Sequence, residues 1–305
     1  MAVTGAGGRL GRAVLAALAE APFTGVAGPL AWGRPDYDLD DPESGPRLIA
    51  RDRPELIVHA AAWTDVDGCA RDPEQAQRRN GDAVSRLAEA AARAGVDLIA
   101  ISTNEVFDGR RTDGRGYRPE DRPDPINAYG SSKLAGELGA AAAFASGSTP
   151  AALAIVRTAW LYGPPGNDFP EKIARAAERA IASGETLRVV GDETGSPTYT
   201  NDVAEGIVEL IGSGEPIAGI HHMVNGGTAT RASWARGVLA GLGIEPRVEE
   251  VPGATWTRAS TPPAWAVLEP TAMPSGEPLR PWTAALADYL PLLRRQLAAV
   301  ASAPG

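Results

Sequence analysis

The first twenty residues constrain the fold of this chain more than any other stretch does. Residues 2–4 are apolar and end a short strand, residues 5–11 read Gly-Ala-Gly-Gly-Arg-Leu-Gly, and an Ala/Leu-rich helix follows to about Ala21. A strand, a glycine-rich turn and a helix in this order are the context in which a dinucleotide-binding turn occurs. The N-terminus therefore predicts the first βα unit of an α/β fold.

Three glycines of this turn, each separated from the next by two residues, have different expected tasks. Gly5 permits the tight turn, Gly8 lets the backbone approach a pyrophosphate, and Gly11 lets the helix pack closely on the strand. The pyrophosphate is expected at the N-terminus of the helix, where unpaired N–H groups and the helix dipole favour negative charge.

The end of the second expected strand, near residues 30–34, indicates which nicotinamide cofactor the fold takes. An Asp or Glu there binds the ribose 2′-hydroxyl of NAD, whereas an Arg accommodates the 2′-phosphate of NADP. Arg34 stands at this place, and the first acid after it is Asp36. The sequence thus favours NADPH, with NADH as the alternative and an ordinary surface role as the other interpretation of Arg34.

Apolar runs and helical stretches alternate along the rest of the chain. The runs at 54–62, 98–101 and 151–163 are continuous enough for strands buried on both faces of a parallel sheet. Further strands are expected at 187–190 and 220–224, and helices at 72–94, 168–183, 231–242 and 282–300. Another helix is expected to be capped near Thr200 or Asn201, and the stretch 252–282 is expected to be irregular. This order predicts an α/β fold with a Rossmann-type, doubly wound parallel sheet.

We expect two regions within this fold. A dinucleotide-binding Rossmann domain is expected at 1–160, and later segments at about 185–225 are expected to return to it. The remaining residues, within 161–305, are expected to form a smaller, discontinuous substrate-binding region.

Tyr129 and Lys133 form the candidate catalytic pair. Their i, i+4 spacing places both side chains on one face of a helix. A nearby ammonium favours the phenolate and lowers the pKa of a phenol, which makes Tyr129 a candidate acid or base. Thr103, at the end of an apolar run, is placed to hydrogen-bond the same oxygen. The sequence has 29 Lys and Arg together but Lys at only two positions, Lys133 and Lys172. A Lys beside Tyr129 therefore supports a chemical role for this pair. The alternative is that both side chains are exposed on a surface helix.

Composition excludes several classes of protein. A formal net charge of −9 argues against nucleic-acid binding. The single cysteine, Cys69, permits neither an internal disulfide nor a multi-cysteine zinc site, and we expect no metal. No signal peptide and no apolar run of about 18 residues is apparent, so we expect a cytoplasmic protein that does not bind membranes.

Several motifs taken together resemble the extended short-chain dehydrogenase/reductases. They are TGAGGRLG (4–11), HAAAWTDVD (59–67), Asn80, ISTNEVFDG (101–109), the Tyr129/Lys133 pair, RTAWLYG (157–163) and GSPTYTNDVA (195–204). Within this superfamily the sequence is most similar to the dTDP-4-dehydrorhamnose reductase branch of sugar-nucleotide reductases. The resemblance covers roughly residues 2–230.

The resemblance assigns roles to individual residues. The catalytic residues of the family match Thr103, Tyr129 and Lys133. With the glycine turn and Arg34 included, the expected cofactor-binding residues are Gly5, Gly8, Arg9, Leu10, Gly11, Arg34, Asp38, Leu39, Ala61, Ala62, Thr64, Tyr129 and Lys133. The family's substrate-side residues match Thr103, Asn104, Trp160, Pro197 and Thr198.

By this resemblance the protein is an NADPH-dependent reductase of the 4-keto group of a nucleotide-linked, dTDP-type 4-keto-6-deoxysugar or a related sugar. Tyr129 is expected to protonate the new alkoxide, and Thr103 to hydrogen-bond the carbonyl. Lys133 is expected to lower the pKa of Tyr129 and to hold the nicotinamide ribose. The expected assembly is a monomer or a homodimer.

Two departures from the pattern of the branch fall on the substrate side. Asn104, followed by Glu105, stands where the branch usually has Asp, and residues 258–270 replace a late Arg-Pro motif, with Arg258 as the nearest cation. The individual sugar and nucleotide are therefore left open. Two other functions also stay open: an NAD(P)-dependent epimerase or dehydratase, for which Glu105 supplies half of an acid pair, and a non-catalytic NADP-binding regulatory subunit.

Overall fold

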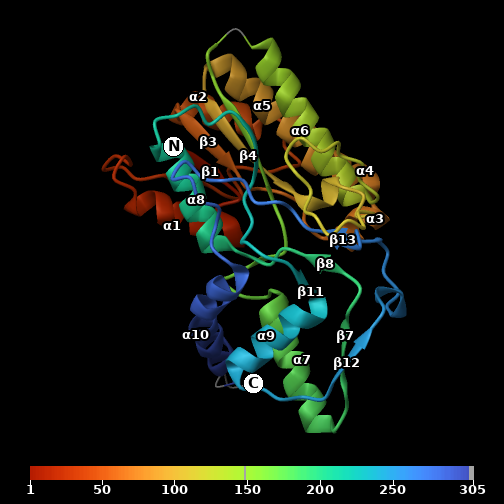
Figure 1. The fold of residues 1–305 in the computed structure, drawn as a ribbon. Helices are drawn as coiled ribbons and strands as arrows, with labels where there is room; N and C mark the ends of the chain where they lie inside the picture. Colours follow the sequence, from red (N-terminus) through yellow and green to blue (C-terminus); the bar gives the residue numbers. More distant parts are fainter. Residues whose placement is uncertain (148, 302–305) are drawn as a thin grey trace.

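A six-stranded, wholly parallel sheet forms the centre of the upper part of the protein in Figure 1. The computed structural model describes residues 1–147 and 149–301, so that 302–305 of the expected substrate-binding region lie outside the described residues. The strands, in spatial order, are β10 (Gly219–His222), β5 (Leu153–Thr158), β4 (Asp97–Thr103), β3 (Leu56–His59), β1 (Ala2–Thr4) and β2 (Leu30–Trp32). The prediction of an α/β fold with a doubly wound parallel sheet is confirmed.

Helices cover both faces of this sheet. On one face lie α1 (Arg9–Glu20) and α8 (Thr200–Gly212), and on the other lie α2 (Ser44–Asp52), α5 (Ala83–Ala94) and α6 (Ala128–Ser146). Because successive residues of a strand point to opposite faces, Ile57 packs in the core under α5 and Val58 in the core under α1. Both are fully buried, which explains why this run is apolar throughout.

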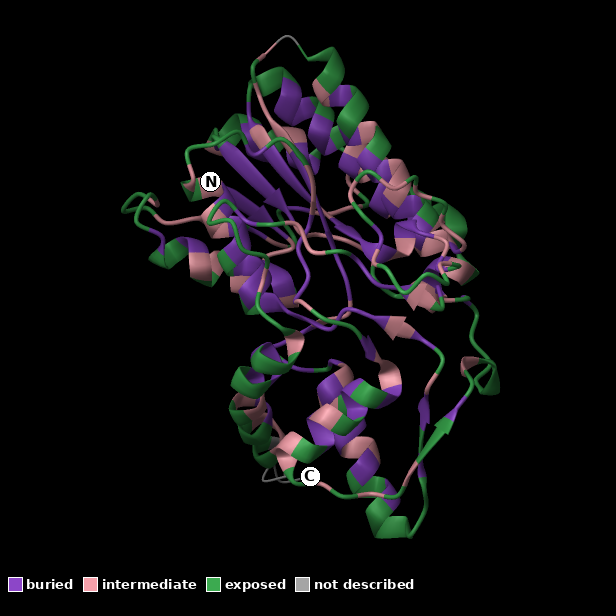
Figure 2. Cartoon of the chain, viewed as in Figure 1, coloured by how far each residue is buried: buried purple, intermediate pink, exposed green. Residues whose placement is uncertain are grey.

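A second group of elements lies below the sheet in Figure 1. It contains α7 (Phe169–Ser183), α9 (Arg231–Leu242), α10 (Trp282–Ala301) and the parallel pair β7 (Leu187–Val190) and β12 (Val248–Val251). Trp234, Tyr162 and Tyr289 are buried in its core. Figure 2 shows the central sheet as a continuous buried layer, with the exposed residues of this lower part on its outer side.

The chain returns from this lower part to the sheet later than residue 185. β7, which we expected among the returning segments, pairs with β12 instead, since Leu187 lies beside Val248. The return is made by α8, which packs on α1, and by β10, which pairs with β5. The sequence of β7 suits both the central sheet and the β7–β12 pair, so its place could be determined only from the strand it pairs with in the fold.

Short strand pairs join the upper and lower parts. β6 (Leu161–Tyr162) pairs with β9 (Thr198–Tyr199), and β8 (Thr194–Gly195) lies between β11 (Ala229–Thr230) and β13 (Trp265–Ala266). β13 and a 3₁₀ turn at Gly253–Thr255 are the regular elements within the stretch 252–282 that we expected to be irregular. The helix that we expected to be capped near Thr200 or Asn201 begins at Thr200, and its N-cap is Tyr199, which makes no side-chain capping hydrogen bond.

The single helix expected over 72–94 is three consecutive elements instead. They are α4 (Pro73–Ala76), a π-helical turn (Gln77–Asp82) and α5, and a further short helix, α3 (Val66–Arg71), precedes them. The π turn contains Asn80, which is fully buried and bonds the backbone of Trp63 twice, accepting from its N–H at 2.8 Å and donating to its carbonyl at 3.0 Å. A π turn adds a residue to a helix and is common beside functional sites. Here it holds the loop after β3 in place.

A buried ion pair fixes α6 against the sheet. Arg157 on β5 donates to Glu137 on α6, with Nη2 at 2.7 Å from Oε2 and Nε at 3.0 Å from Oε1. Both side chains are at most 5% exposed. The Ser102 hydroxyl on β4 donates to the same carboxylate, and the Arg157 guanidinium lies 5.2 Å from the ring centroid of Phe107. α6, β4 and β5 are therefore joined at one point.

None of the helices in the described part of the chain is long and apolar enough to cross a membrane.

The Glu137–Arg157 pair predicts an asymmetric effect on stability. Glu137→Ala leaves the Arg157 charge buried without a partner, so we expect the free energy of unfolding to fall by about 3–5 kcal/mol. The double variant Glu137→Leu/Arg157→Met replaces both charges by apolar groups and should be markedly more stable than Glu137→Ala. Urea unfolding followed by circular dichroism measures both; equal stabilities of the two variants would contradict the prediction.

Candidate functional site

A cavity of about 580 Å³ lies at the carboxyl ends of β1, β2 and β3. β1 has β2 on one side and β3 on the other, so the strand order changes direction there, which is where open α/β sheets bind ligands. The residues lining the cavity are Gly5, Gly7, Gly8, Gly33, Arg34, Tyr37, Asp38, Leu39, Ala60, Ala61, Ala62, Trp63 and Arg79. Of the expected cofactor-binding residues, Gly5, Gly8, Arg34, Asp38, Leu39, Ala61 and Ala62 lie in this wall.

The glycine turn has the geometry that a bound dinucleotide requires. Gly5 has φ +64°, and a Cβ there would lie 2.7 Å from the Ala61 nitrogen. A Cβ on Gly11 would lie 2.2 Å from the Gly5 carbonyl oxygen, so this glycine permits the close packing of α1 on the turn. Gly8 caps α1, whose first N–H groups have no partner within the helix. These residues fit a pyrophosphate at the helix N-terminus.

The side chains of Arg9 and Leu10 do not line this cavity. Arg9 donates to the carbonyl oxygens of Gly163 at 3.1 Å and Gly166 at 2.8 Å, which ties α1 to the loop after β6. Leu10 is buried in the core between α1 and the sheet. At both positions only the backbone N–H remains for a phosphate. Thr64 is exposed beyond Trp63 and is not part of the cavity wall.

A buried hydrogen-bond chain shapes the end of β3. The Thr4 hydroxyl lies 2.8 Å from Nδ1 of His59 and accepts from the backbone N–H of Ala61 at 3.2 Å. Burial, with a smaller effect of Lys133, lowers the pKa of His59 to about 3, so the imidazole is neutral at physiological pH. Neutral Nδ1 can accept from the Thr4 hydroxyl, which leaves that oxygen free to accept from Ala61. The chain fixes the Ala60–Ala62 segment of the cavity wall.

The three expected catalytic residues come together beside this segment. Thr103 ends β4, and Tyr129 and Lys133 lie in the first two turns of α6. Thr103 lies close enough to Tyr129 to affect the pKa of its phenol, and the Lys133 ammonium donates to the Ile101 carbonyl on β4 at 2.7 Å. Asn127 caps α6, its side-chain oxygen accepting from the Gly130 N–H at 2.8 Å. The N-cap and the ammonium contact hold the helix in register with the strand.

The protonation states in this group differ from the expectation. Burial raises the pKa of Tyr129, the Glu105 carboxylate raises it further, and the nearby Thr103 hydroxyl lowers it. Burial lowers the pKa of Lys133 to about 8, and its ammonium is bonded to Ile101. The expected lowering of the Tyr129 pKa by Lys133 is therefore absent from the described contacts. Desolvation has the largest effect on both groups because both are largely removed from water.

The expected substrate-side residues form part of the junction between upper and lower parts. Asn104 is buried and bridges Thr103 to the Ala266 carbonyl, to which it donates at 3.2 Å. Trp160 has φ +41° and stacks on Trp234 with 5.7 Å between ring centroids. Pro197, which lies between β8 and β9, and Thr198, the first residue of β9, are both buried. The Arg231 guanidinium lies 3.6 Å from the Trp160 ring centroid.

An ionic cluster beside Trp160 contains residues that the sequence did not single out. Arg258, which it did, donates to Glu193 at 2.7 Å, and Arg231 lies 3.6 Å from the same carboxylate. Burial lowers the pKa of Arg231 to about 10, against the effect of Glu193. Burial raises the pKa of Glu105, whose carboxylate accepts from Asn127 at 2.7 Å. These residues come from four distant segments, so no local motif could have indicated the cluster.

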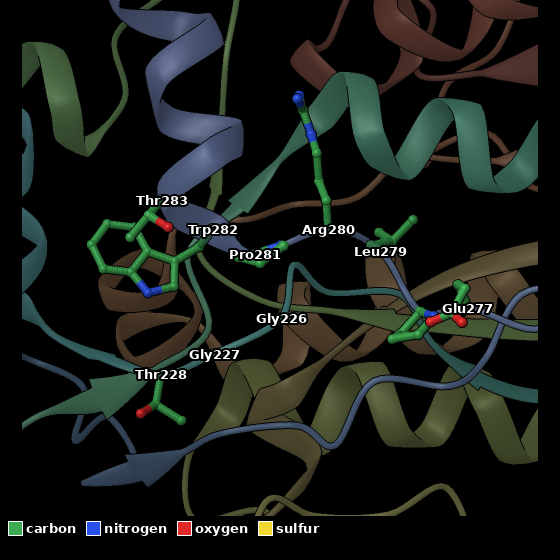
Figure 3. A pocket seen from close by; sticks show the side chains of 10 residues that line it. Gly226, Gly227, Thr228, Glu277, Leu279, Arg280, Pro281, Trp282 and Thr283 are labelled. Carbon is green, nitrogen blue, oxygen red and sulfur yellow. The ribbon is translucent and has the colours of Figure 1, made fainter.

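A separate cavity of about 510 Å³, shown in Figure 3, lies where the segment 277–283 passes Gly226 and Gly227. Arg280 extends away from Trp282 and Thr228 in this view. Its guanidinium binds Asp202 on α8 at 2.9 Å and also pairs with Asp288 on α10. None of the expected site residues lines this cavity, and Arg280 connects the upper part of the protein, at α8, to the lower part, at α10.

In the described part of the chain, no group of three His, Cys, Asp or Glu side chains is placed to hold a metal ion.

Known proteins match almost the whole chain. The family model of the RmlD substrate binding domain matches residues 1–295. The dTDP-4-dehydrorhamnose reductase of Mycobacterium tuberculosis (strain ATCC 25618 / H37Rv) is 37% identical over 298 residues, 95% of this chain and 92% of that protein. The dTDP-4-keto-6-deoxy-D-glucose reductase of Streptomyces niveus is 37% identical over 295 residues, 95% of this chain and 96% of that protein.

A solved structure agrees with the fold over the same length. It is the dTDP-4-dehydrorhamnose reductase of Bacillus anthracis in complex with NADP, with a TM-score of 0.83 and 27% identity. The match covers 95% of this chain and 98% of that one. The resemblance stated from the sequence motifs is confirmed by these matches.

The lowered pKa of Lys133 can be measured directly, because the sequence has only two lysines, Lys133 and Lys172. Lysine labelled at its side chain should give two NMR signals, and the Lys172→Arg variant assigns them. We expect the Lys133 signal to titrate with a midpoint near pH 8 in the protein without ligands, because burial disfavours the ammonium. A midpoint above about 10, the ordinary range of lysine, would show that the ammonium is not desolvated.

Proposed function

Because the chain belongs to the family of the RmlD substrate binding domain, we propose that it is an NADPH-dependent reductase of a dTDP-linked 4-keto-6-deoxysugar or a related nucleotide sugar. The observation that supports this most is the placement of Thr103, at the end of β4, close to Tyr129, at the same strand edge as the glycine-lined cavity. Relatives with this activity in their names match the chain over nearly its full length.

NADPH, when bound, supplies the hydride that reduces the keto carbon. Gly5, Gly8 and the N-terminus of α1 would hold its diphosphate, and Arg34 would lie near the adenosine. Ala61 and Ala62, which follow β3, would leave room for the nicotinamide half.

Tyr129 is the proton donor in this proposal. Its raised pKa keeps the phenol protonated at neutral pH, which suits the donation of a proton to the oxygen of the carbonyl as it is reduced. The Thr103 hydroxyl lies close to the phenol and is near enough to bond the same substrate oxygen. Lys133 follows Tyr129 by one helical turn, but its ammonium donates to the Ile101 carbonyl. Its role in this proposal is therefore to hold the nicotinamide ribose.

The direct test is a cofactor oxidation assay. Purified protein is mixed with NADPH or NADH and each of a small set of dTDP-4-keto-6-deoxysugars, and the absorbance of the reduced nicotinamide is followed. Oxidation that depends on one keto sugar supports the proposal and identifies substrate and cofactor together. Binding of NADP without oxidation by any sugar would contradict it and favour the regulatory function.

Glu105 supports a second candidate, an epimerase or dehydratase that retains its nicotinamide. Its carboxyl is buried, has a raised pKa and acts on Tyr129 through space, so it is placed to exchange a proton next to a keto group. A reaction in deuterium oxide separates the functions. Deuterium on a ring carbon next to the keto carbon, lost in Glu105→Gln, would favour the second candidate. Deuterium-free ring carbons with stoichiometric NADPH oxidation would favour the reductase.

Tyr129→Phe tests the acid role. We expect NADPH binding to be retained and kcat to fall by about 10²–10⁴-fold, the usual contribution of general acid catalysis. Tyr117→Phe is the matched control, since its hydroxyl binds Asp108 outside the catalytic group and its loss should leave kcat nearly unchanged. Near-full activity of Tyr129→Phe would show that another group donates the proton.

A further inference from the structure

Arg79 is the one arginine of the cavity wall that the sequence did not indicate. It lies in the π-helical turn, directly before the buried Asn80, and so its backbone is fixed. Its guanidinium lies 5.4 Å from the ring centroid of Trp63, another residue of the wall. Its fork binds Asp40 through two hydrogen bonds, one of them 2.8 Å long from Nε to Oδ1.

Asp40 lines a neighbouring cavity of about 330 Å³ that shares Leu39 with the cofactor cavity, and Arg79 lines the cofactor cavity itself. Asp40 directly follows Asp38 and Leu39, which line the wall, and its N–H donates to the Asp38 carboxylate at 3.0 Å. The hydrogen bond from Arg79 is the main cause of a lowered pKa of Asp40, and the charges of Arg79, Arg78 and Arg34 lower it further. Arg34 is therefore close enough to act on the same carboxylate, and two guanidinium groups of the wall converge on it.

Arg34 and Arg79 differ in their hydrogen-bond and salt-bridge partners. Arg34 is exposed and has no hydrogen bond or salt bridge to any residue within 1–147 or 149–301. Arg79 is held by Asp40, but the pair is open to solvent, with 27% of the Arg79 and 48% of the Asp40 side chain exposed. An ion pair this exposed contributes little to stability, so Arg79 can exchange it at small cost. A phosphate offers the same fork two oxygens and a larger charge.

We propose that Arg79 and Arg34 together bind the 2′-phosphate of NADPH, and that Asp40 is the internal anion that occupies Arg79 when no 2′-phosphate is present. This rests on the cofactor site of the proposed function. With NADH, Arg79 stays on Asp40 and the 2′-hydroxyl gains nothing from it. With NADPH, Arg79 leaves Asp40 and binds the 2′-phosphate. The preference for NADPH then reflects how much more favourably Arg79 binds the phosphate than it binds the Asp40 carboxylate.

Equilibrium binding of NADP and NAD, measured by calorimetry, tests the proposal without turnover. Arg79→Gln should weaken NADP binding by about tenfold or more, as loss of a charge-assisted hydrogen bond does, and change NAD binding less than about twofold. Asp40→Asn removes the competitor and should tighten NADP binding while leaving NAD binding unchanged. Arg79→Lys keeps a charge without the fork and should fall between wild type and Arg79→Gln for NADP alone.

Arg78→Gln is the matched control. It removes the same charge one residue away, from an exposed side chain that is not part of the wall of the cofactor cavity. Equal effects of Arg78→Gln and Arg79→Gln on NADP would overturn the proposal, because the arginines would then act only through overall charge. Equal weakening of NADP and NAD by Arg79→Gln would overturn it as well, since Arg79 would serve the shared diphosphate or the fold. Weaker NADP binding in Asp40→Asn would also contradict it.

The wild type separates this proposal from the proposed function. Oxidation of NADPH by a keto sugar in the wild type, with an unchanged preference for NADP over NAD in Arg79→Gln, would remove the role of Arg79 and leave the reductase intact. Wild type that binds NAD and NADP equally would overturn the role of Arg79 directly, whichever reaction the protein catalyses.

Discussion

The position of the catalytic helix depends on one buried contact between charges. Glu137 on α6 receives the Arg157 guanidinium from β5 and the Ser102 hydroxyl from β4. Lys133 lies four residues before Glu137, one helical turn nearer the site, and Ser102 directly precedes Thr103. A shift of α6 along the sheet would therefore break this carboxylate network and separate Tyr129 from Thr103 at once. A charged pair that is costly to bury is also costly to displace, so the network fixes the register of the active groups.

Desolvation, rather than neighbouring charge, sets the ionisation of the site before ligands bind. It raises the pKa of Tyr129 and Glu105 and lowers the pKa of Lys133, His59 and Arg231. Each of these groups is pushed toward its neutral form by the same dry surroundings. A neutral Tyr129 is the form that can donate a proton, and a charge that develops in such surroundings interacts strongly with the groups arranged to receive it.

The parts of the fold that local physics determines were predictable from the sequence. The glycine turn needs residues without a Cβ, and the strands buried on both faces need continuous apolar runs, so both were visible along the chain. The partner of β7, the π turn at Asn80 and the cavity wall at Arg79 depend on residues far away in the sequence. The same holds for Arg9 and Leu10, whose side chains turned out to serve the loop after β6 and the core rather than the phosphate. The cluster of Glu193, Arg231 and Arg258 likewise exists only after α9 and the segment before β13 have packed together.

The late return of the chain to the central sheet has a consequence for how the protein is made. β5 has β4 on one side and β10 on the other, yet sixty residues separate β5 from β10 in the sequence, and they include α7, β7 and α8. While the ribosome synthesises this stretch, the outer edge of β5 has no partner. Unpaired strand edges of this kind pair with other chains. The nascent chain is thus most prone to aggregation before β10 emerges, and synthesis must outpace that association for the sheet to close.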